Sequence, residues 1–381
     1  MRLTSKQIEG LKSRFGVDRL WSYSRLTTFA ERPFEYRVAY LEKSARSTSV
    51  YTIWGTNCHD LVQDAYTGEY GFDEMGDKFE QKLADWIIDN QGFGFPNENI
   101  EKSYFENIRH YYHNPEPIDC EMVCERPILY QLEGDKGEPI VFIGYVDGEY
   151  WGVDEEGNKK YYVVDFKSSS KSGFSGKQLK EKSKQLMLYS AAISQQRGIP
   201  LEDIVCRFDM LKYVNVSYLQ KNGKWRTSAQ ERRKWVETQE KKIRTLMLEN
   251  GADFIEIDLD VAQALHDNNM DRLPDYVKEK FKVSNCYIDV PVTQEDIDSL
   301  NRFIIDNVTE CVELEQGDWE INFPEPNMDT LGDFYYSVLA PQIRNQSKTW
   351  QENKGMKLRT ENITSSESED FFNSLFGNSN E

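Results

Sequence analysis

Two aspartates and a lysine stand where a β-hairpin would bring them onto one face. The β-rich runs that contain Asp147 and Asp165 flank a polar turn centred on residue 156. If the two runs pair around this turn, the numbers of opposed residues sum to 312, twice the number of the turn centre. Asp147 then lies directly across from Asp165. Lys167, two residues after Asp165, lies on the same face of its strand.

Two opposed carboxylates repel each other, and a divalent cation between them removes that cost. Mg²⁺ and Mn²⁺ take carboxylate oxygens together with water and substrate phosphate. A neighbouring lysine can orient or deprotonate the attacking water, or stabilise charge on the phosphate. The alternative is a surface hairpin in which aspartate and lysine form an ion pair. The spacing alone is compatible with both.

A polar stripe is predicted on the helix that follows the hairpin. Gln178, Lys182, Gln185 and Tyr189 are separated by steps of four, three and four residues, so their side chains share one helix face. Beside the carboxylates, such a stripe would hold a DNA backbone or orient the active site. The alternative is a solvated helix face.

The charge of the chain is unevenly distributed. The 381 residues include 46 Lys and Arg against 65 Asp and Glu, a net charge of −19, which excludes a histone-like protein held on nucleic acid by bulk charge. Residues 159–184 nevertheless contain eight lysines and only two acidic residues. This segment is either the basic wall of a phosphate-binding groove or a solvated lysine-rich loop.

The composition also indicates the cellular compartment and how the chain is divided into parts. No apolar run approaches the ~20 residues that a bilayer-spanning helix needs, no secretory signal opens the chain, and we expect no membrane association. The six cysteines are scattered, with no zinc-site spacing, which indicates reduced thiols in a cytosol-like compartment. Four parts are predicted: a mainly helical region with the histidine motif (1–115), a core (116–250), a mixed region (251–355) and a disordered acidic tail (356–381).

Within the core, β-rich runs precede a helix over residues 178–195 and a strand over 204–214, and residues 229–250 predict a long charged helix. The chemistry-bearing residues occur in a fixed order along these elements. The order is Tyr23-Ser-Arg-Leu-Thr-Thr-Phe29, Gly55-x-x-x-His59, Gly144-x-x-Asp147, Asp165-x-Lys167 and Gln185-x-x-x-Tyr189. It resembles the RecB-like branch of the PD-(D/E)XK nuclease superfamily, which includes CRISPR-associated and phage-type exonucleases.

The resemblance implies an α/β fold: a PD-(D/E)XK core with a mixed central sheet flanked by helices, and helical N- and C-terminal additions. It implies Mg²⁺ or Mn²⁺ bound by four groups, which are the side chains of His59, Asp147 and Asp165 and the backbone carbonyl of Phe166. Without the resemblance, a single histidine such as His59 is more often structural. A family glutamate before the hairpin corresponds to Glu125.

Roles follow from the same resemblance. Asp147, Asp165 and Lys167 are expected to be catalytic, and Gln185, Tyr189 and Lys182 to support the active site and contact DNA. The expected activity is metal-dependent DNA hydrolysis, by an exonuclease of recombination, repair or replication in a bacterial or phage-infected host cytoplasm. The alternatives are a structure-specific endonuclease within a replication or recombination complex, and a catalytically inactive binding module with the nuclease fold.

The cysteines depart from the pattern of the CRISPR-associated members. Those proteins often carry a cysteine just after the first aromatic motif and a later cysteine cluster, which together hold an iron–sulfur centre. Here Glu31-Arg32-Pro33 occupies the first place, and Cys206, Cys286 and Cys311 are far apart. We expect no iron–sulfur cluster.

The acidic tail carries a possible docking motif. Phe371, Phe372, Leu375 and Phe376 follow a run of acidic residues, and one helical turn would align them as an apolar ridge. Such a segment would fold on a replication or recombination protein that has a hydrophobic groove and a basic rim. The alternative is a solubilising tail.

Overall fold

The computed structural model describes residues 2–89 and 92–353. The predicted acidic tail and its docking motif lie outside the described residues. Contacts divide the chain into two compact units. The first unit comprises Met1–Tyr23 and Thr52–Asp306, and the second comprises Ser24–Tyr51 and Asn307–Glu381. The four-part division drawn from composition stays a prediction, because these units follow contacts between segments that are distant in sequence.

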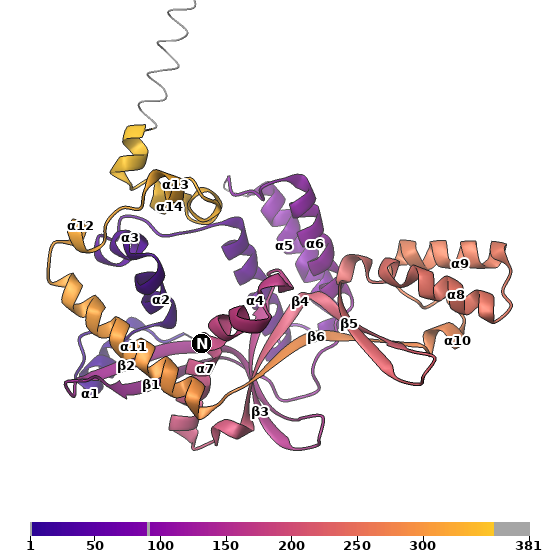
Figure 1. The fold of residues 1–381 in the computed structure, drawn as a ribbon, viewed down its shortest axis with the longest axis horizontal. Helices are drawn as coiled ribbons and strands as arrows, with labels where there is room; N and C mark the ends of the chain where they lie inside the picture. Colours follow the sequence, from indigo (N-terminus) through magenta and orange to yellow (C-terminus); the bar gives the residue numbers. More distant parts are fainter. Residues whose placement is uncertain (1, 90–91, 354–381) are drawn as a thin grey trace, which may run out of the picture. The chain divides into compact units, whose positions relative to one another are not determined.

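The first unit contains a mixed six-stranded sheet, as predicted (Figure 1). Strands β1 to β5 follow one another in chain order, and β6 pairs with β4 on its other side. Only the β3–β4 pair is parallel among the described strands. The strands are β1 (Val123–Glu133), β2 (Pro139–Val153), β3 (Lys159–Lys167), β4 (Ile204–Leu219), β5 (Trp225–Glu231) and β6 (Phe281–Pro291).

The β2–β3 hairpin has the predicted register. Gly148 pairs with Val164 and Tyr150 with Tyr162, so the paired numbers sum to 312 as expected. The turn fixes this register because the Asp154 carboxylate accepts a hydrogen bond from the Asn158 backbone N–H at 2.7 Å. The hairpin therefore aligns the two strands as far as the positions next to Asp147 and Asp165.

Helices cover both faces of the sheet. The helix α7 (Gly176–Arg197) packs on β1, β3 and β4, and the Ser190 hydroxyl lies 3.3 Å from the Cys206 thiol. On the opposite face, Tyr66 of α4 (Val50–Thr67) stacks on Phe166, and α6 (Glu98–His113) packs against β4. This arrangement confirms the predicted α/β class with a mixed sheet between helices.

The second unit is held together around Tyr36. This residue donates a hydrogen bond to Glu315 at 2.6 Å and packs among buried aromatic rings. No described helix is long and apolar enough to cross a membrane. The other α-helices are α1 (Ser5–Phe15), α2 (Tyr23–Glu31), α3 (Pro33–Tyr36), α5 (Met75–Ile88), α8 (Glu240–Glu249), α9 (Phe254–Asp267), α10 (Asp275–Lys278), α11 (Gln294–Glu315), α12 (Trp319–Asn322), α13 (Met328–Leu331) and α14 (Pro341–Arg344).

Short 3₁₀ and π turns join these elements: η1 (Arg37–Leu41), η2 (Phe72–Glu74), η3 (Lys171–Gly173), η4 (Leu201–Asp203), η5 (Arg232–Lys234), η6 (Glu237–Gln239) and η7 (Tyr335–Leu339). The predicted long helix over 229–250 is wrong in its first half. Residues up to Glu231 belong to β5, two 3₁₀ turns follow, and α8 begins only at Glu240. Pairing with β4 satisfies the backbone there, and this tertiary contact overrides the helical pattern of charges.

Trp54 anchors α4 to the helices beside it, and its removal should destabilise the fold. Its side chain is fully buried and its ring contacts Phe79 of α5 and Phe105 of α6. Trp54→Ala is expected to lower the free energy of unfolding by about 3–5 kcal/mol. Trp54→Phe should cost much less, because the indole N–H has no hydrogen-bond partner among the described residues. Equal losses for both variants in urea denaturation would contradict this packing role.

Candidate metal centre

Three elements bring the predicted metal ligands together. Ligand atoms of His59 on α4, Asp147 on β2 and Asp165 on β3 all lie within 4.8 Å of one another. His59 Nδ1 is 3.2 Å from an Asp147 carboxylate oxygen, and His59 Nε2 is 2.5 Å from the Phe166 carbonyl oxygen. The described part of the chain holds no other group of three such residues at this spacing. The His59 ring thus has the Asp147 carboxylate at its Nδ1 and the Phe166 carbonyl at its Nε2, and Asp165 lies close by.

Asp165 has an unsatisfied oxygen at this point. Its carboxylate is buried, and Oδ2 accepts a hydrogen bond from Lys167 Nζ at 2.7 Å. Its other oxygen, Oδ1, is buried and has no hydrogen-bond partner among the described residues. A buried, unpaired carboxylate oxygen is costly, and a cation would satisfy it. The donor set therefore fits a divalent cation that accepts oxygen and imidazole ligands.

Burial and charge set the protonation of these groups. Burial lowers the pKa of His59, which favours the neutral imidazole that a metal requires. Burial and the nearby charge of Asp165 raise the pKa of Asp147 well above its usual range. For Lys167, burial opposes the ammonium form, but the charge and hydrogen bond of Asp165 outweigh it and raise its pKa. The carboxylate pair is thus under repulsion that a cation would relieve.

Glu125 approaches the same acids from β1 with an unusual backbone. It lies between Cys124 and Arg126, which pair with Gly148 and Val146, so it stands opposite Asp147. Its φ of 49° is a left-handed value that costs energy in a residue other than glycine. The sequence pointed to Glu125 only through the family resemblance, because glutamate carries no local signal for this conformation.

The polar stripe of α7 reaches the site through Tyr189. Gln185 Nε2 donates a hydrogen bond to the Tyr189 hydroxyl at 2.8 Å. Burial raises the pKa of Tyr189 to about 12, and the charges of Asp147 and Asp165 add to this effect. A Cβ at Gly144 would lie 2.5 Å from the Tyr189 ring, so glycine at this position is what lets the tyrosine approach β2.

Lys182 also lies near the centre. Its ammonium group is 4.3 Å from the centroid of the Phe174 ring, and its pKa is lowered by burial and by the positive charge of Lys167. It lines a surface pocket with Gln178 and three serines, Ser169, Ser170 and Ser172. This pocket combines a cation and neutral hydrogen-bond donors with one acid, Glu181, which pairs with Lys184.

The lysine-rich segment 159–184 is only partly available to a ligand. Lys160, Lys180 and Lys184 form ion pairs with Asp203, Asp296 and Glu181. Within the described ranges, Lys171, Lys177 and Lys182 form none. Lys159 at the start of β3 also forms no ion pair among the described residues and lies at the Trp151 ring. The other free cations of this segment lie along the loop after β3 and the first turns of α7.

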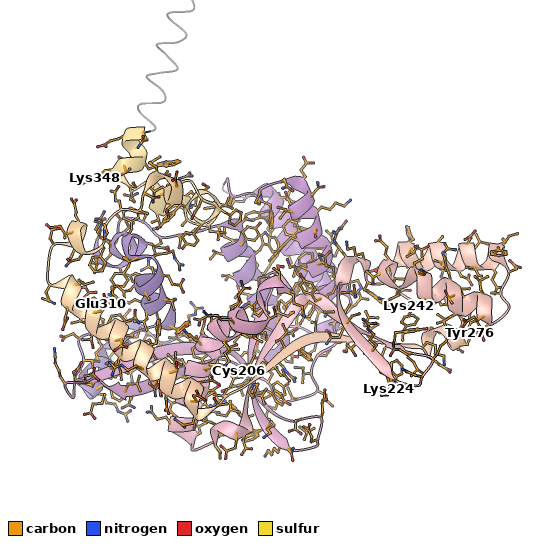
Figure 2. All side chains as sticks on the ribbon, in the orientation of Figure 1. Cys206, Lys224, Lys242, Tyr276, Glu310 and Lys348 are labelled. Atoms are coloured by element: carbon orange, nitrogen blue, oxygen red, sulfur yellow. The ribbon has the colours of Figure 1, made fainter. Side chains whose placement is uncertain are left out.

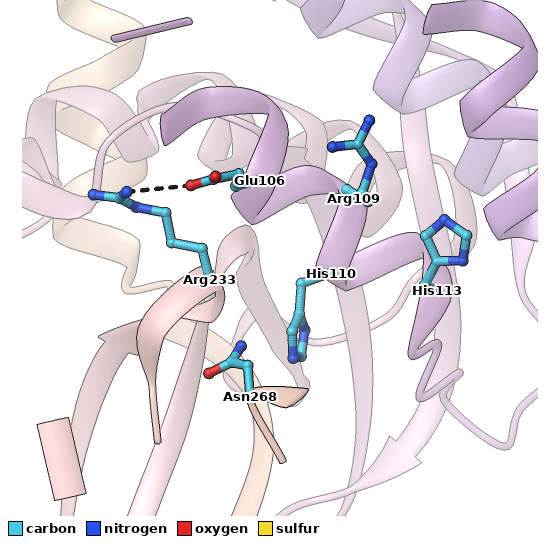
Figure 3. Close-up of a pocket in the computed structure, with 6 residues that line it drawn as sticks. All are labelled: Glu106, Arg109, His110, His113, Arg233 and Asn268. Atoms are coloured by element: carbon cyan, nitrogen blue, oxygen red, sulfur yellow. Dashed lines mark hydrogen bonds and ion pairs between the residues drawn. The ribbon is translucent and has the colours of Figure 1, made fainter. Parts of the chain in front are cut away.

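A second pocket, lined by α6 and nearby loops, is a weaker candidate (Figure 3). Arg109 and His113 both bind Glu80, and Arg233 pairs with Glu106 at 3.3 Å. Burial lowers the pKa of His110 to about 4, so this histidine is neutral at pH 7. The positive side chains of this pocket are thus already neutralised by acids.

Residues 20–271 match the family model of the PD-(D/E)XK nuclease superfamily. The chain belongs to this superfamily. The match covers the hairpin, α4 and α7, and a search of the curated proteins finds no match. Membership indicates a metal-dependent nuclease with a nucleic-acid substrate, and the RecB-like branch stays a prediction.

Loss of His59 should weaken metal binding without unfolding the protein. The imidazole is about one-third exposed, so His59→Ala removes little packing. We expect Mn²⁺ to raise the melting temperature of the wild type, because a ligand that binds only the folded state stabilises it. His59→Ala should raise the Mn²⁺ concentration needed for that shift at least tenfold. A large drop in metal-free melting temperature with unchanged Mn²⁺ dependence would make His59 a structural residue instead.

Proposed function

We propose that this protein is a Mg²⁺- or Mn²⁺-dependent deoxyribonuclease that degrades DNA from an end. The observation that carries the proposal is the convergence of His59, Asp147, Asp165 and the Phe166 carbonyl beside Lys167. A set of this composition favours an active enzyme over an inactive binding module, because a bound cation would satisfy the buried, unpaired oxygen of Asp165. Action from an end rests on the resemblance to exonucleases.

The ligands would be His59 Nε2, the two carboxylates and the Phe166 carbonyl oxygen. When bound, the cation supplies charge stabilisation at the phosphate and lowers the pKa of water. The Lys167 ammonium group lies 2.7 Å from the Asp165 carboxylate. In this position the ammonium group can donate a hydrogen bond to a non-bridging phosphate oxygen.

Residues of α7 would position the DNA strand at the scissile phosphate. Tyr189 and Gln185 form a hydrogen-bonded pair next to the carboxylates, with Gly144 making room for the ring. Lys182 and the serines of the neighbouring pocket offer a cation and hydroxyl donors, which are the groups that commonly bind phosphate oxygens. Together they would hold the backbone in register with the metal centre.

The activity itself is tested by comparing two DNA topologies. Purified full-length protein with Mg²⁺ or Mn²⁺ should degrade end-labelled linear DNA and spare a covalently closed circle of the same sequence. Cleavage of both would identify an endonuclease, for which branched and flapped substrates then test structure specificity. Cleavage of neither, by protein that shows a Mn²⁺-dependent melting shift, would overturn the nuclease proposal.

The carboxylates and the lysine should differ in what their loss does. Asp165→Ala removes a proposed ligand and should abolish both cleavage and the Mn²⁺-dependent melting shift. Lys167→Ala should keep that shift and lower kcat about 10²–10³-fold, the usual cost of removing one charge-stabilising donor. The control is Glu155→Ala, which changes an exposed acid in the turn of the same hairpin. Wild-type cleavage by Asp165→Ala would show that the active site lies elsewhere.

A further inference from the structure

Strand β4 continues well beyond the metal centre and forms the middle of a three-stranded arm. We define the arm as residues 214–231 and 281–285, the outer part of β4 with β5 and the start of β6 (Figure 1). Ser217 pairs with Thr227 on one side and with Lys282 on the other, so these three residues form a row across the arm.

The two faces of the arm differ in character. On one face Val214, Val216 and Phe281 are buried in a hydrophobic cluster that includes α8 and α9. Because side chains alternate along a strand, the row of Ser217, Thr227 and Lys282 lies on the other face. Trp225 is 39% exposed, and Lys282 Nζ lies 4.5 Å from the centre of its ring. This outer face therefore presents an accessible aromatic ring beside a cation.

The arm is basic in an acidic protein. The arm contains four Lys and Arg residues and one acidic residue, Glu231 at the end of β5, although acidic residues outnumber basic ones by 65 to 46 in the whole chain. Lys224 lies near the tip of the arm (Figure 2). Lys224, Lys282 and the neighbouring Lys280 form no ion pair within the described residues. Their charges are thus available to an anionic partner.

The arm leads directly from the metal centre along one strand. Lys167 at the end of β3 pairs with Met210 of β4, and Ser217 follows seven residues later. At about 3.3 Å per residue this is at most about 23 Å, which corresponds to about seven stacked nucleotides. The bulge between Asp209 and Val214 shortens the path.

We propose that the outer face of the arm binds single-stranded DNA about seven nucleotides from the cleavage position. Trp225 stacks on a base, and Lys282, which lies beside its ring, contacts the neighbouring phosphate. Stacking requires an unpaired base, and an aromatic ring with flanking cations is the usual platform for single strands. The inference rests on the proposed nuclease function and adds to it a site for the strand outside the metal centre.

The test measures binding of labelled single-stranded DNA of 24 nucleotides by full-length protein in EDTA, where cleavage cannot occur. Trp225→Ala should weaken binding about 5- to 100-fold, the usual cost of one lost base stack, and Trp225→Phe should recover most of it. Lys282→Ala should lower the slope of log affinity against log salt by about 0.7.

The chain provides a matched control in Trp151, which is 45% exposed and has Lys159 Nζ 4.4 Å from its ring centre. This pair lies beside the acidic turn of the β2–β3 hairpin, so Trp151→Ala should leave binding unchanged. The arm proposal would be overturned if Trp151→Ala and Trp225→Ala weakened DNA binding equally. It would also be overturned if Trp225→Ala melted like the wild type and bound DNA as tightly.

Three further outcomes separate the hypotheses. If the arm variants weaken only duplex binding, the assignment to single strands is wrong. If the wild type cleaves DNA normally while Trp225→Ala binds as tightly as it does, only the arm proposal fails. If the wild type neither binds nor cleaves DNA, the proposed function fails and the arm proposal fails with it.

Discussion

The repulsion between Asp147 and Asp165 is the constraint on which the rest of the site depends. The β2–β3 register, fixed by the Asp154 turn, forces two carboxylates together at a partly buried position, and one oxygen is left without a partner among the described residues. A fold accepts such a cost where a cation offsets it. The groups around the two carboxylates then act on the same charge: His59 and the Phe166 carbonyl would complete the metal ligands, and Lys167 balances the negative charge of Asp165.

Other features of the first unit serve the same arrangement. Gly144 lets Tyr189 approach β2, and Glu125 holds a left-handed backbone opposite Asp147. Strain and close approach at such positions are typical of sites where function overrides local preference. Strand β4 connects this centre to the arm, where Trp225 and Lys282 lie on the face that we propose for single-stranded DNA.

The sequence predicted the parts of the site that depend on local pattern. The hairpin register followed from the turn alone, and the stripe on α7 followed from helical spacing. The approach of His59 could be expected only through the family resemblance, because α4 and the hairpin are distant in sequence. The pairing of β6 with β4 was missed because long-range pairing leaves no local signal. The strand that ends at Glu231 forms a hairpin with β4 across the Asn222-Gly223 turn, and it was missed because its charged residues continue into a pattern that favours a helix. The left-handed backbone of Glu125 could not be predicted from the sequence either.

The most direct test of the account is the position of a bound metal. A crystal of the full-length protein grown with Mn²⁺ and measured for anomalous scattering should show a strong peak within about 2.5 Å of His59 Nε2, the Asp147 and Asp165 carboxylates and the Phe166 carbonyl. To reach that point the His59 ring must release the Phe166 carbonyl, which it now approaches at 2.5 Å. A fully occupied Mn²⁺ peak elsewhere, with the His59–Phe166 contact unchanged, would contradict the proposed metal centre.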